Sequence, residues 1–469
     1  MSSRNISGAT VLKETTSRCP VCGVKCPAVV VRRAGAVYLE RTCALHGEFS
    51  ACLASDERFY WLAKGNDENR SCCTGGACCS AEGSAAGTLG RNAGGRKDET
   101  FEVLSTCLAL IEIVNSCNLA CPTCYADSPI GTGSKVDAVP LEEIQARVQG
   151  VIDRKGNIEI LQLSGGEPTL HPQLFELCRW LKAHPKIDFV LINTNGVRLA
   201  KEPEFARQLN DAFQGTGVQL YLQFDGVQAA GQKGLRGADL RTLRESALAN
   251  CAAADLPVTL AMTVTPENLP HLWEAVSFGL SQQGVHGITF QPVFDSGRGK
   301  TGALAAAAAN PFRKEVRFKN DRLNTADVLL NVVAQAEGKL KFEDFTPLPC
   351  GDPNCATIGY LIRQGDNVWP VSQFLDFTKL QGFLQDKIHY TLEDLAKCGC
   401  ENTELGELLK LMERTRSMAF RIMVKPFMDA WTWDEDRIDR CCTHVIRPDG
   451  KLDSFCRYYS GFSDTRPAP

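Results

Sequence analysis

The chain has 469 residues, of which 44% are hydrophobic and 23% charged, a composition typical of a globular protein. Its 51 basic and 55 acidic side chains give a net charge of −4, which is too balanced for a protein whose main partner is DNA or RNA. No stretch reaches the roughly 20 apolar residues that cross a bilayer, and the opening Met-Ser-Ser-Arg-Asn lacks the apolar core of a signal peptide. We therefore expect a cytoplasmic protein that binds no nucleic acid and spans no membrane.

Cysteine is the residue type that decides the protein class. The chain holds 22 cysteines, many of them clustered. Secreted disulfide scaffolds are usually far shorter, so clustered cysteines in a chain of this length indicate thiolates that hold metal in a reducing compartment.

Residues 1–62 are predicted to form a small metal unit. Two apolar runs, 28–32 and 37–40, flank Ala34-Gly35, which predicts a β-hairpin. Residues 63–100 follow as a Gly- and Ser-rich linker that has too little apolar surface to fold. Its two cysteine pairs could bind a soft metal, form a redox pair or have no function; they are Cys72, Cys73, Cys78 and Cys79.

The first unit has the cysteine spacing of a zinc ribbon or a rubredoxin-like knuckle. Cys19-Pro-Val-Cys22 precedes the hairpin, and Cys43-Ala-Leu-His46 follows it. Such a set suits one tetrahedral ion, iron or zinc, with His46 or Cys26 as the fourth ligand. We expect the ion mainly to fold a unit too small to be stable alone, rather than to transfer electrons.

Residues 101–345 alternate apolar, β-branched runs with amphipathic stretches. Parallel strands need crossover connections, so this rhythm predicts βαβ units, in either a doubly wound sheet or a barrel. In both folds the site lies at the carboxyl ends of the strands. Strands are expected at 108–114, 158–163, 189–192, 218–224, 258–264 and 288–293, and helices at 141–153, 172–183, 204–213, 240–253 and 269–282.

Three cysteines follow the first of these strands. Cys117, Cys121 and Cys124 are separated by three and by two residues. Three thiolates on one short loop can hold three corners of a 4Fe-4S cluster and leave its fourth iron open for chemistry. The alternative is a zinc knuckle, but that needs a fourth ligand, and the next cysteine or histidine is His171.

This motif resembles the signature of the radical S-adenosylmethionine (SAM) superfamily, whose fold is a (β/α)6 partial TIM barrel. The resemblance implies that Cys117, Cys121 and Cys124 are the catalytic cluster ligands. It also implies that one-electron cleavage of bound SAM gives a 5′-deoxyadenosyl radical that abstracts hydrogen from an unactivated carbon. The family has an aromatic residue where this chain has Thr123; Tyr125 is expected to lie beside the adenine instead.

Further strand ends match the same family. Ser164-Gly165-Gly166-Glu167 resembles the Gly-Gly-Glu element that contacts the amino group of SAM. Glycines allow a close backbone approach, and a carboxylate accepts from an ammonium group. Residues expected to face the ribose and the methionine carboxylate are Asn193, Asn195, Gln223, Asp225 and Gln291.

Residues 346–469 are predicted to be an auxiliary iron-sulfur domain. Seven thiolates can hold one 4Fe-4S cluster plus three corners of another, or one cluster with spare cysteines. These candidate ligands are Cys350, Cys355, Cys398, Cys400, Cys441, Cys442 and Cys456.

The segments around these cysteines resemble the branch of tetraether synthases and class D radical SAM methylases. The similar segments are 344–350, 427–430 and 448–450, together with His46-Gly47. The branch implies carbon-carbon bond formation by methyl transfer or lipid chain coupling, one or two auxiliary 4Fe-4S clusters, a small-molecule or lipid substrate, and a flavodoxin or ferredoxin reductant. Peptide substrates come second, because the Cys-x2-Cys-x5-Cys-x3-Cys run of peptide-maturing enzymes is missing. The other hypotheses are an iron-sulfur electron carrier or redox sensor, and a zinc-ribbon interaction protein.

Overall fold

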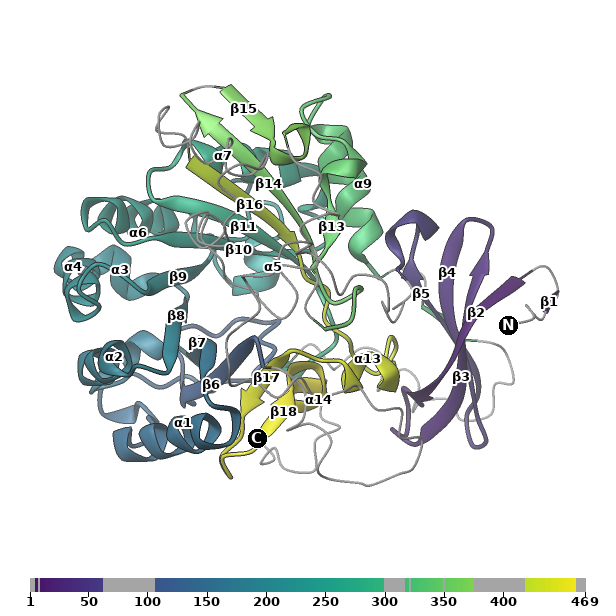
Figure 1. Cartoon of the computed structure of the whole chain (residues 1–469), viewed down its shortest axis with the longest axis horizontal. Helices are drawn as coiled ribbons and strands as arrows, with labels where there is room; N and C mark the ends of the chain where they lie inside the picture. The colour runs from purple at the N-terminus through teal and green to yellow at the C-terminus, as the bar shows by residue number, and fades with distance from the viewer. Residues whose placement is uncertain are drawn as a thin grey trace, which may run out of the picture.

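Two β-sheets organise the chain in the computed structural model, one small and antiparallel, the other large and mostly parallel (Figure 1). The structure describes residues 5–6, 9–61, 106–298, 317–319, 322–348, 351–365, 367–374 and 418–460. The predicted linker with its two cysteine pairs lies outside these residues. So do Cys350, Cys398 and Cys400.

All six predicted strands of the barrel are present. Consecutive strands pair in parallel in the order β6-β7-β8-β9-β10-β11. A doubly wound sheet would reverse its strand order at a switch point, so the sequential order selects the partial barrel. The strands are β6 (Leu108–Val114), β7 (Ile158–Gly165), β8 (Ile187–Thr194), β9 (Val218–Gln223), β10 (Val258–Val264) and β11 (Val285–Pro292).

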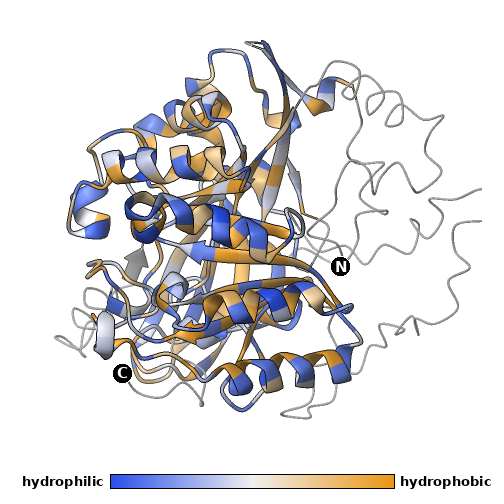
Figure 2. Ribbon diagram, turned by 90° about the vertical axis from the view of Figure 1, so that its left-hand side faces the viewer, coloured by the Kyte–Doolittle hydropathy of each residue, from blue (hydrophilic) through white to orange (hydrophobic). Residues whose placement is uncertain are grey.

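The crossover helices cover the outer face of the barrel. Their apolar side chains face the sheet and their polar side chains face outward (Figure 2). No helix among the described residues is long and apolar enough to cross a membrane. The helices are α1 (Leu141–Lys155), α2 (Leu174–Ala183), α3 (Val197–Lys201), α4 (Pro203–Ala212), α5 (Gln232–Arg236), α6 (Arg241–Ala253), α7 (Leu272–Ser281) and α9 (Thr325–Gln335).

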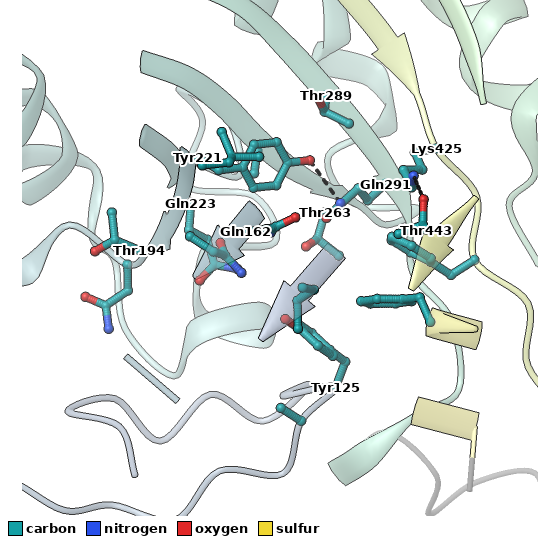
Figure 3. Close-up of a pocket in the computed structure, with 18 of the residues that line it drawn as sticks. Tyr125, Gln162, Thr194, Tyr221, Gln223, Thr263, Thr289, Gln291, Lys425 and Thr443 are labelled. Atoms are coloured by element: carbon teal, nitrogen blue, oxygen red, sulfur yellow. Dashed lines mark hydrogen bonds between the residues drawn. The ribbon is translucent and has the colours of Figure 1, made fainter. Parts of the chain in front are cut away.

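The C-terminal segment extends the barrel sheet at both edges. Strand β16 (Met418–Val424) pairs in parallel with β11, and β17 (Thr443–Ile446) pairs in parallel with β6. Lys425 Nζ donates to Thr443 Oγ1 at 3.0 Å and so joins the two edges across the open side of the barrel (Figure 3). The sheet thus continues across the boundary predicted at residue 345. The other elements here are β13 (Thr346–Pro347), β14 (Thr357–Gln364), β15 (Asn367–Pro370), β18 (Leu452–Ser454), α13 (Glu435–Asp439) and α14 (Phe455–Ser460).

The N-terminal unit is an antiparallel sheet that carries the predicted hairpin. Ala34 and Gly35 both have positive φ, 49° and 78°, which is the backbone of a type I′ turn. The strands are β1 (Asn5–Ile6), β2 (Ala9–Arg18), β3 (Lys25–Arg33), β4 (Ala36–Cys43) and β5 (Gly47–Ala54), with β12 (Arg317–Lys319) added in parallel to β5.

The contact between β11 and β16 gives a stability prediction. A Cβ atom on Gly287 would overlap the backbone carbonyl of Arg421 on the neighbouring strand. We expect Gly287→Ala to lower the free energy of unfolding by about 1–3 kcal/mol, the usual cost of overpacking. Gly234→Ala is the matched control, because a Cβ there meets nothing within 4 Å. Equal thermal melting temperatures for the two variants would contradict the strand pairing.

Candidate active site and metal centres

A cavity of about 190 Å³ lies inside the barrel, bounded by the loop that carries Cys117, Cys121 and Cys124 (Figure 3). Alternation along each strand sets its lining. On β9, Val218, Leu220 and Leu222 pack outward against the helices. The intervening side chains that line the cavity are Gln219, Tyr221 and Gln223.

The three loop cysteines lie close to one another but not at zinc spacing. Burial raises the pKa of the Cys117 thiol to about 12, and the neighbouring Cys121 and Cys124 contribute in the same direction. A tetrahedral zinc ion with Zn–S bonds of 2.3 Å holds its sulfur ligands about 3.8 Å apart. Among the described residues the loop cysteines form no group of that size. They therefore lack the compact arrangement that the alternative zinc knuckle requires.

Glycines hold the cysteine loop from two sides. Gly166 N donates to Val114 O at 2.6 Å and Glu167 N to Ser116 O at 3.1 Å. A Cβ on Gly165 or on Gly166 would overlap these loop carbonyls. On the opposite side Gly297 packs equally close to Cys124 O. The glycines are therefore needed for packing against the loop, whether or not a cofactor approaches them.

The two residues next to Gly297 donate hydrogen bonds to the backbone of the cysteine loop. Arg298 N donates to Cys124 O at 3.0 Å, and Arg298 Nη1 donates to Cys121 O at 3.1 Å. Ser296 Oγ donates to Tyr125 O at 3.2 Å. The segment that follows β11 thus fixes the backbone between the second and third cysteines.

Glu167 is buried at the cavity wall and ties neighbouring strand ends together. It accepts from Thr169 Oγ1 at 2.6 Å, Thr194 Oγ1 at 2.7 Å and Asn195 N at 2.7 Å. Burial raises the pKa of Glu167, and these donors oppose the rise. The Asn195 amide in turn donates to Asn118 Oδ1 at 2.6 Å and lies 3.7 Å from Cys117 Sγ.

Asp225 lies outside the cavity lining and contacts a residue that belongs to it. Its carboxylate is fully buried and forms an ion pair with Arg236 at 2.6 and 2.8 Å. The described cavity lining includes Arg236 but not Asp225. In the amide orientation that satisfies its neighbours, Gln223 also accepts from Arg236 Nη1 at 2.8 Å. The structure therefore places Arg236, which the sequence analysis missed, between Asp225 and the thiol of Cys121.

Arg244 is a second residue that the sequence analysis did not identify, and its guanidinium group lacks hydrogen-bond partners. Its side chain is 1% exposed, and none of its three guanidinium nitrogens has a hydrogen-bond partner. Burial lowers its pKa to about 10, and its charge interacts with those of Asp225 and Glu167. An unpaired buried cation is costly, and a ligand carboxylate would satisfy it with two parallel hydrogen bonds. The signal in the sequence was an arginine on the apolar face of α6.

The other predicted cofactor residues line the cavity. Tyr125 is partly buried, with its ring centroid 4.9 Å from that of Tyr459. Its hydroxyl lies 3.4 Å from Ser164 Oγ, to which the Asn193 amide donates at 3.3 Å. Gln291 Nε2 donates to Tyr221 Oη at 3.0 Å (Figure 3).

The N-terminal unit holds a compact set of four ligands. Cys22 Sγ and Cys43 Sγ are 3.8 Å apart, and His46 Nδ1 lies 3.6 Å from both Cys19 Sγ and Cys43 Sγ. These spacings match a tetrahedral ion. Cys26 instead directs its thiol to Val24 O at 3.4 Å and is not in the group. The geometry therefore favours His46 over Cys26 as the fourth ligand.

Four described cysteines of the C-terminal segment lie near one another, and two of them interact with the partly buried Arg437. Arg437 Nε donates to Cys355 Sγ at 3.3 Å, and the Cys456 thiolate would also stabilise this guanidinium. Burial raises the pKa of Cys456 to about 12, with Cys441 and Cys355 nearby. Cys442 follows Cys441, and its carbonyl accepts from the backbone of Cys107, a buried cysteine that the sequence analysis did not single out.

Comparison with known families agrees with this geometry. Residues 111–279 match the radical SAM superfamily. This part of the chain belongs to the radical SAM superfamily. Membership implies SAM and a 4Fe-4S cluster as cofactors. Residues 11–55 match the HMPTM N-terminal zinc ribbon domain, and the four-ligand group lies within them.

Curated radical SAM relatives match over different lengths. A 7,8-dihydro-6-hydroxymethylpterin dimethyltransferase of Methanocaldococcus jannaschii is 24% identical over 95% of this chain and 93% of its own length. The mycofactocin maturase MftC of Mycobacterium ulcerans is 32% identical, but over 34% of this chain and 41% of its own. A GTP 3′,8-cyclase of Chlorobaculum tepidum is 37% identical over 20% and 26%. The chain thus spans less than half of these last two relatives.

Solved radical SAM structures are more distant. Streptococcus suis SuiB aligns with a TM-score of 0.35 and 12% identity, over 52% of this chain and 55% of its own. Methylornithine synthase (PylB) aligns with a TM-score of 0.33 and 13% identity, over 49% and 70%. Scores this low add nothing to the assignment.

The zinc-ribbon geometry gives a metal-binding prediction. We expect Cys26→Ser to keep the ion and His46→Ala to lose most of it, because among the described residues His46, and not Cys26, belongs to the compact four-residue group. Elemental analysis of the purified full-length chain measures both. Loss of the ion from the Cys26 variant alone would show that Cys26 is the fourth ligand.

Proposed function

We propose that the chain is a radical SAM methyltransferase that forms carbon-carbon bonds on a small polar heterocycle. The observation that carries the proposal is the single cavity that joins the three loop cysteines to a barrel interior lined by amide and hydroxyl side chains. The similarity to the M. jannaschii pterin dimethyltransferase along almost the whole chain supports methyl transfer.

The cofactor site fits SAM through its own residues. Cys117, Cys121 and Cys124 would hold the cluster, and Arg244 would bind the methionine carboxylate. Once bound and reduced, the cluster and SAM supply a 5′-deoxyadenosyl radical for hydrogen abstraction. The role of the surrounding chain is to orient SAM and exclude water, which the buried network of Glu167 and Asn195 supports.

The lining of the cavity favours a polar substrate over lipid chains. Inward-facing amides and hydroxyls gather on neighbouring strands, which suits a ring with several hydrogen-bonding edges. These side chains are Gln162, Gln219, Tyr221, Gln223, Thr263, Thr289 and Gln291. Apolar side chains such as Leu110, Phe189 and Phe427 line the rest of the cavity and would pack against the faces of such a ring. A pterin-like ring is therefore our first substrate class.

Two basic side chains in the cavity favour a substrate that carries an anionic group. Arg421 on β16 and Lys425, the residue directly after this strand, line the cavity. No carboxylate among the described residues forms an ion pair with either side chain, although Lys425 donates to Thr443. A substrate with a carboxylate or phosphate group would complement them.

The C-terminal cysteines suit an auxiliary 4Fe-4S cluster. Cys355, Cys441 and Cys456 interact electrostatically, and Cys442 lies beside them. Four thiolates are the ligand set of such a cluster. A flavodoxin or ferredoxin in a reducing cytoplasm would supply the electrons, and the second candidate function is an electron carrier that needs no SAM.

Anaerobic assays test the proposed function. With dithionite, SAM, reduced pterins and a one-carbon donor, tested as either excess SAM or a reduced pterin that carries a one-carbon unit, the reconstituted protein should release 5′-deoxyadenosine and add methyl groups that mass spectrometry detects on the pterin carbons. Arg421→Met should raise KM at least tenfold for pterins with an anionic group and change it little for neutral ones. Cluster reduction without 5′-deoxyadenosine would favour the electron carrier, and 5′-deoxyadenosine without methylation would rule out the methyltransferase.

Arg244 gives a prediction for cofactor binding. Arg244→Met should weaken SAM binding about ten- to a hundredfold, because it removes charge-assisted hydrogen bonds to the carboxylate. Arg241→Met is the matched control on the same helix, where an exposed ion pair with Asp239 is lost instead. Equilibrium dialysis with labelled SAM measures the affinity of each variant for SAM, with both variants prepared to the same iron content per chain. Equal affinities for SAM would disprove the role of Arg244.

A further inference from the structure

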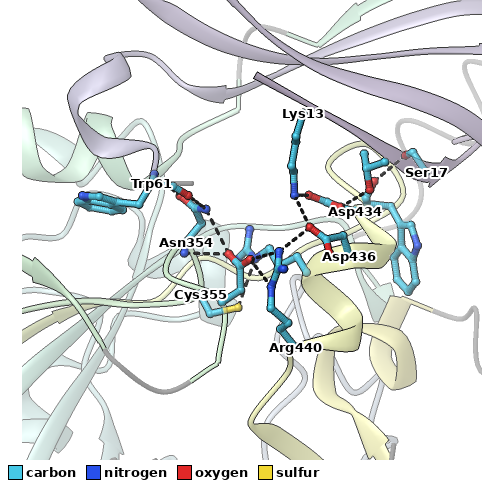
Figure 4. Close-up of polar contacts among 12 residues, drawn as sticks. Lys13, Ser17, Trp61, Asn354, Cys355, Asp434, Asp436 and Arg440 are labelled. Carbon is cyan, nitrogen blue, oxygen red and sulfur yellow. Dashed lines mark hydrogen bonds and ion pairs between the residues drawn. The ribbon is translucent and has the colours of Figure 1, made fainter. Parts of the chain in front are cut away.

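The zinc ribbon packs on the two loops that lead to the C-terminal cysteines. Residues 351–355 end at Cys355, and residues 426–440 lead to Cys441. Apart from the short helix α13, these loops have no helix or strand of their own. Their geometry therefore depends on what they contact, and much of that contact comes from the ribbon (Figure 4).

The metal knuckle itself forms the first contact. Cys19, Cys26 and Cys43 share an apolar cluster with Trp431, whose ring centroid lies 5.9 Å from that of Phe49. Folding of the knuckle around its ion thus shapes the surface on which Trp431 sits.

Arg41 lies between the knuckle and the same loop. Its side chain is buried and donates to Trp431 O at 2.8 Å and to Ala430 O at 3.0 Å. One guanidinium therefore satisfies two consecutive carbonyls of a loop that has no ladder of hydrogen bonds. This contact fixes the loop backbone as well as its side chains.

Strand β2 forms a polar ladder with the start of α13. Lys13 pairs with Asp434 at 2.6 Å and with Asp436 at 3.0 Å. Thr15 Oγ1 donates to Asp434 at 2.6 Å, and Ser17 Oγ donates to Trp433 O at 2.6 Å (Figure 4). Alternate residues of one strand thus hold the segment that leads into Cys441.

Asn354, the residue before Cys355, is bound by the end of the ribbon unit. Its Oδ1 accepts from Trp61 N at 2.9 Å, and its Nδ2 donates to Trp61 O at 2.7 Å. Asp352 in the same loop pairs with Arg440 at 3.0 Å, which connects the two loops to each other. The ribbon and this ion pair together hold the loop of Cys355 beside the segment that leads to Cys441, and the two cysteines interact electrostatically.

We propose that the metal-bound ribbon is the platform on which the auxiliary cluster site assembles. The inference rests on the auxiliary cluster of the proposed function and gives the ribbon a positioning role in place of electron transfer. Loops without regular structure lose conformational entropy when their cysteines converge on one cluster. Contact with the ribbon orders these loops before iron binds, so part of the entropy loss has already occurred and the cysteines are already held in position.

Two interface variants and one control test the proposal in the full-length chain. Arg41→Met and Asn354→Ala each remove one contact with a cysteine loop. Arg33→Met is the control, since Arg33 lies in the same sheet but pairs with Glu40, away from the loops. Iron, sulfide and zinc are measured per chain after anaerobic purification, together with the electron paramagnetic resonance spectrum with and without SAM.

We expect both interface variants to lose about four irons per chain, one cubane, while they keep the spectral change that SAM causes at the first cluster. That change also shows that the barrel is folded. His46→Ala, which loses the ion, should show the same selective loss, and alkylation of Cys355 should be faster in all three variants than in the control.

Wild-type iron contents in both interface variants would overturn the platform role and leave the proposed function intact. A wild-type chain that itself holds only about four irons would overturn the auxiliary cluster and the platform role together.

Discussion

The packing of the cysteine loop against glycine is the constraint on which the rest of the site depends. Gly165 and Gly166 contact one side of the loop and Gly297 the other, at distances that leave no room for a Cβ atom. Because these glycines follow β7 and β11, strands that lie on either side of the barrel, the loop is fixed relative to the whole sheet. A cluster on this loop therefore has a defined position above the cavity.

The buried charged side chains around this loop are not all paired. Asp225 is matched by Arg236, and Glu167 by four neutral donor groups. Arg244 alone has no partner, although it lies near both carboxylates. A protein bears the cost of one unpaired buried cation more readily where a ligand restores the balance. This imbalance is the basis for the proposed binding of a ligand carboxylate by Arg244, which lies beside the described cavity lining rather than in it.

The open side of the six-stranded barrel is narrowed by residues from far along the chain. Strands β16 and β17 extend opposite edges, and Lys425 and Thr443 meet between them. The same C-terminal segment carries Cys441 and Cys456 and rests on the zinc ribbon. The barrel cavity, the C-terminal cysteines and the ribbon are therefore joined by direct contacts.

The sequence alone determined the features that depend on local spacing. Strand alternation placed β6 to β11 to within a few residues, and Cys117-x3-Cys121-x2-Cys124 identified the cluster loop. Only the tertiary structure decided which distant groups meet: the pairing of Asp225 with Arg236, the isolation of Arg244, and the two C-terminal strands at opposite edges of the barrel. Short-range periodicity is encoded in neighbouring residues, whereas ion pairs and strand partners hundreds of residues apart are selected by the packing of the whole fold.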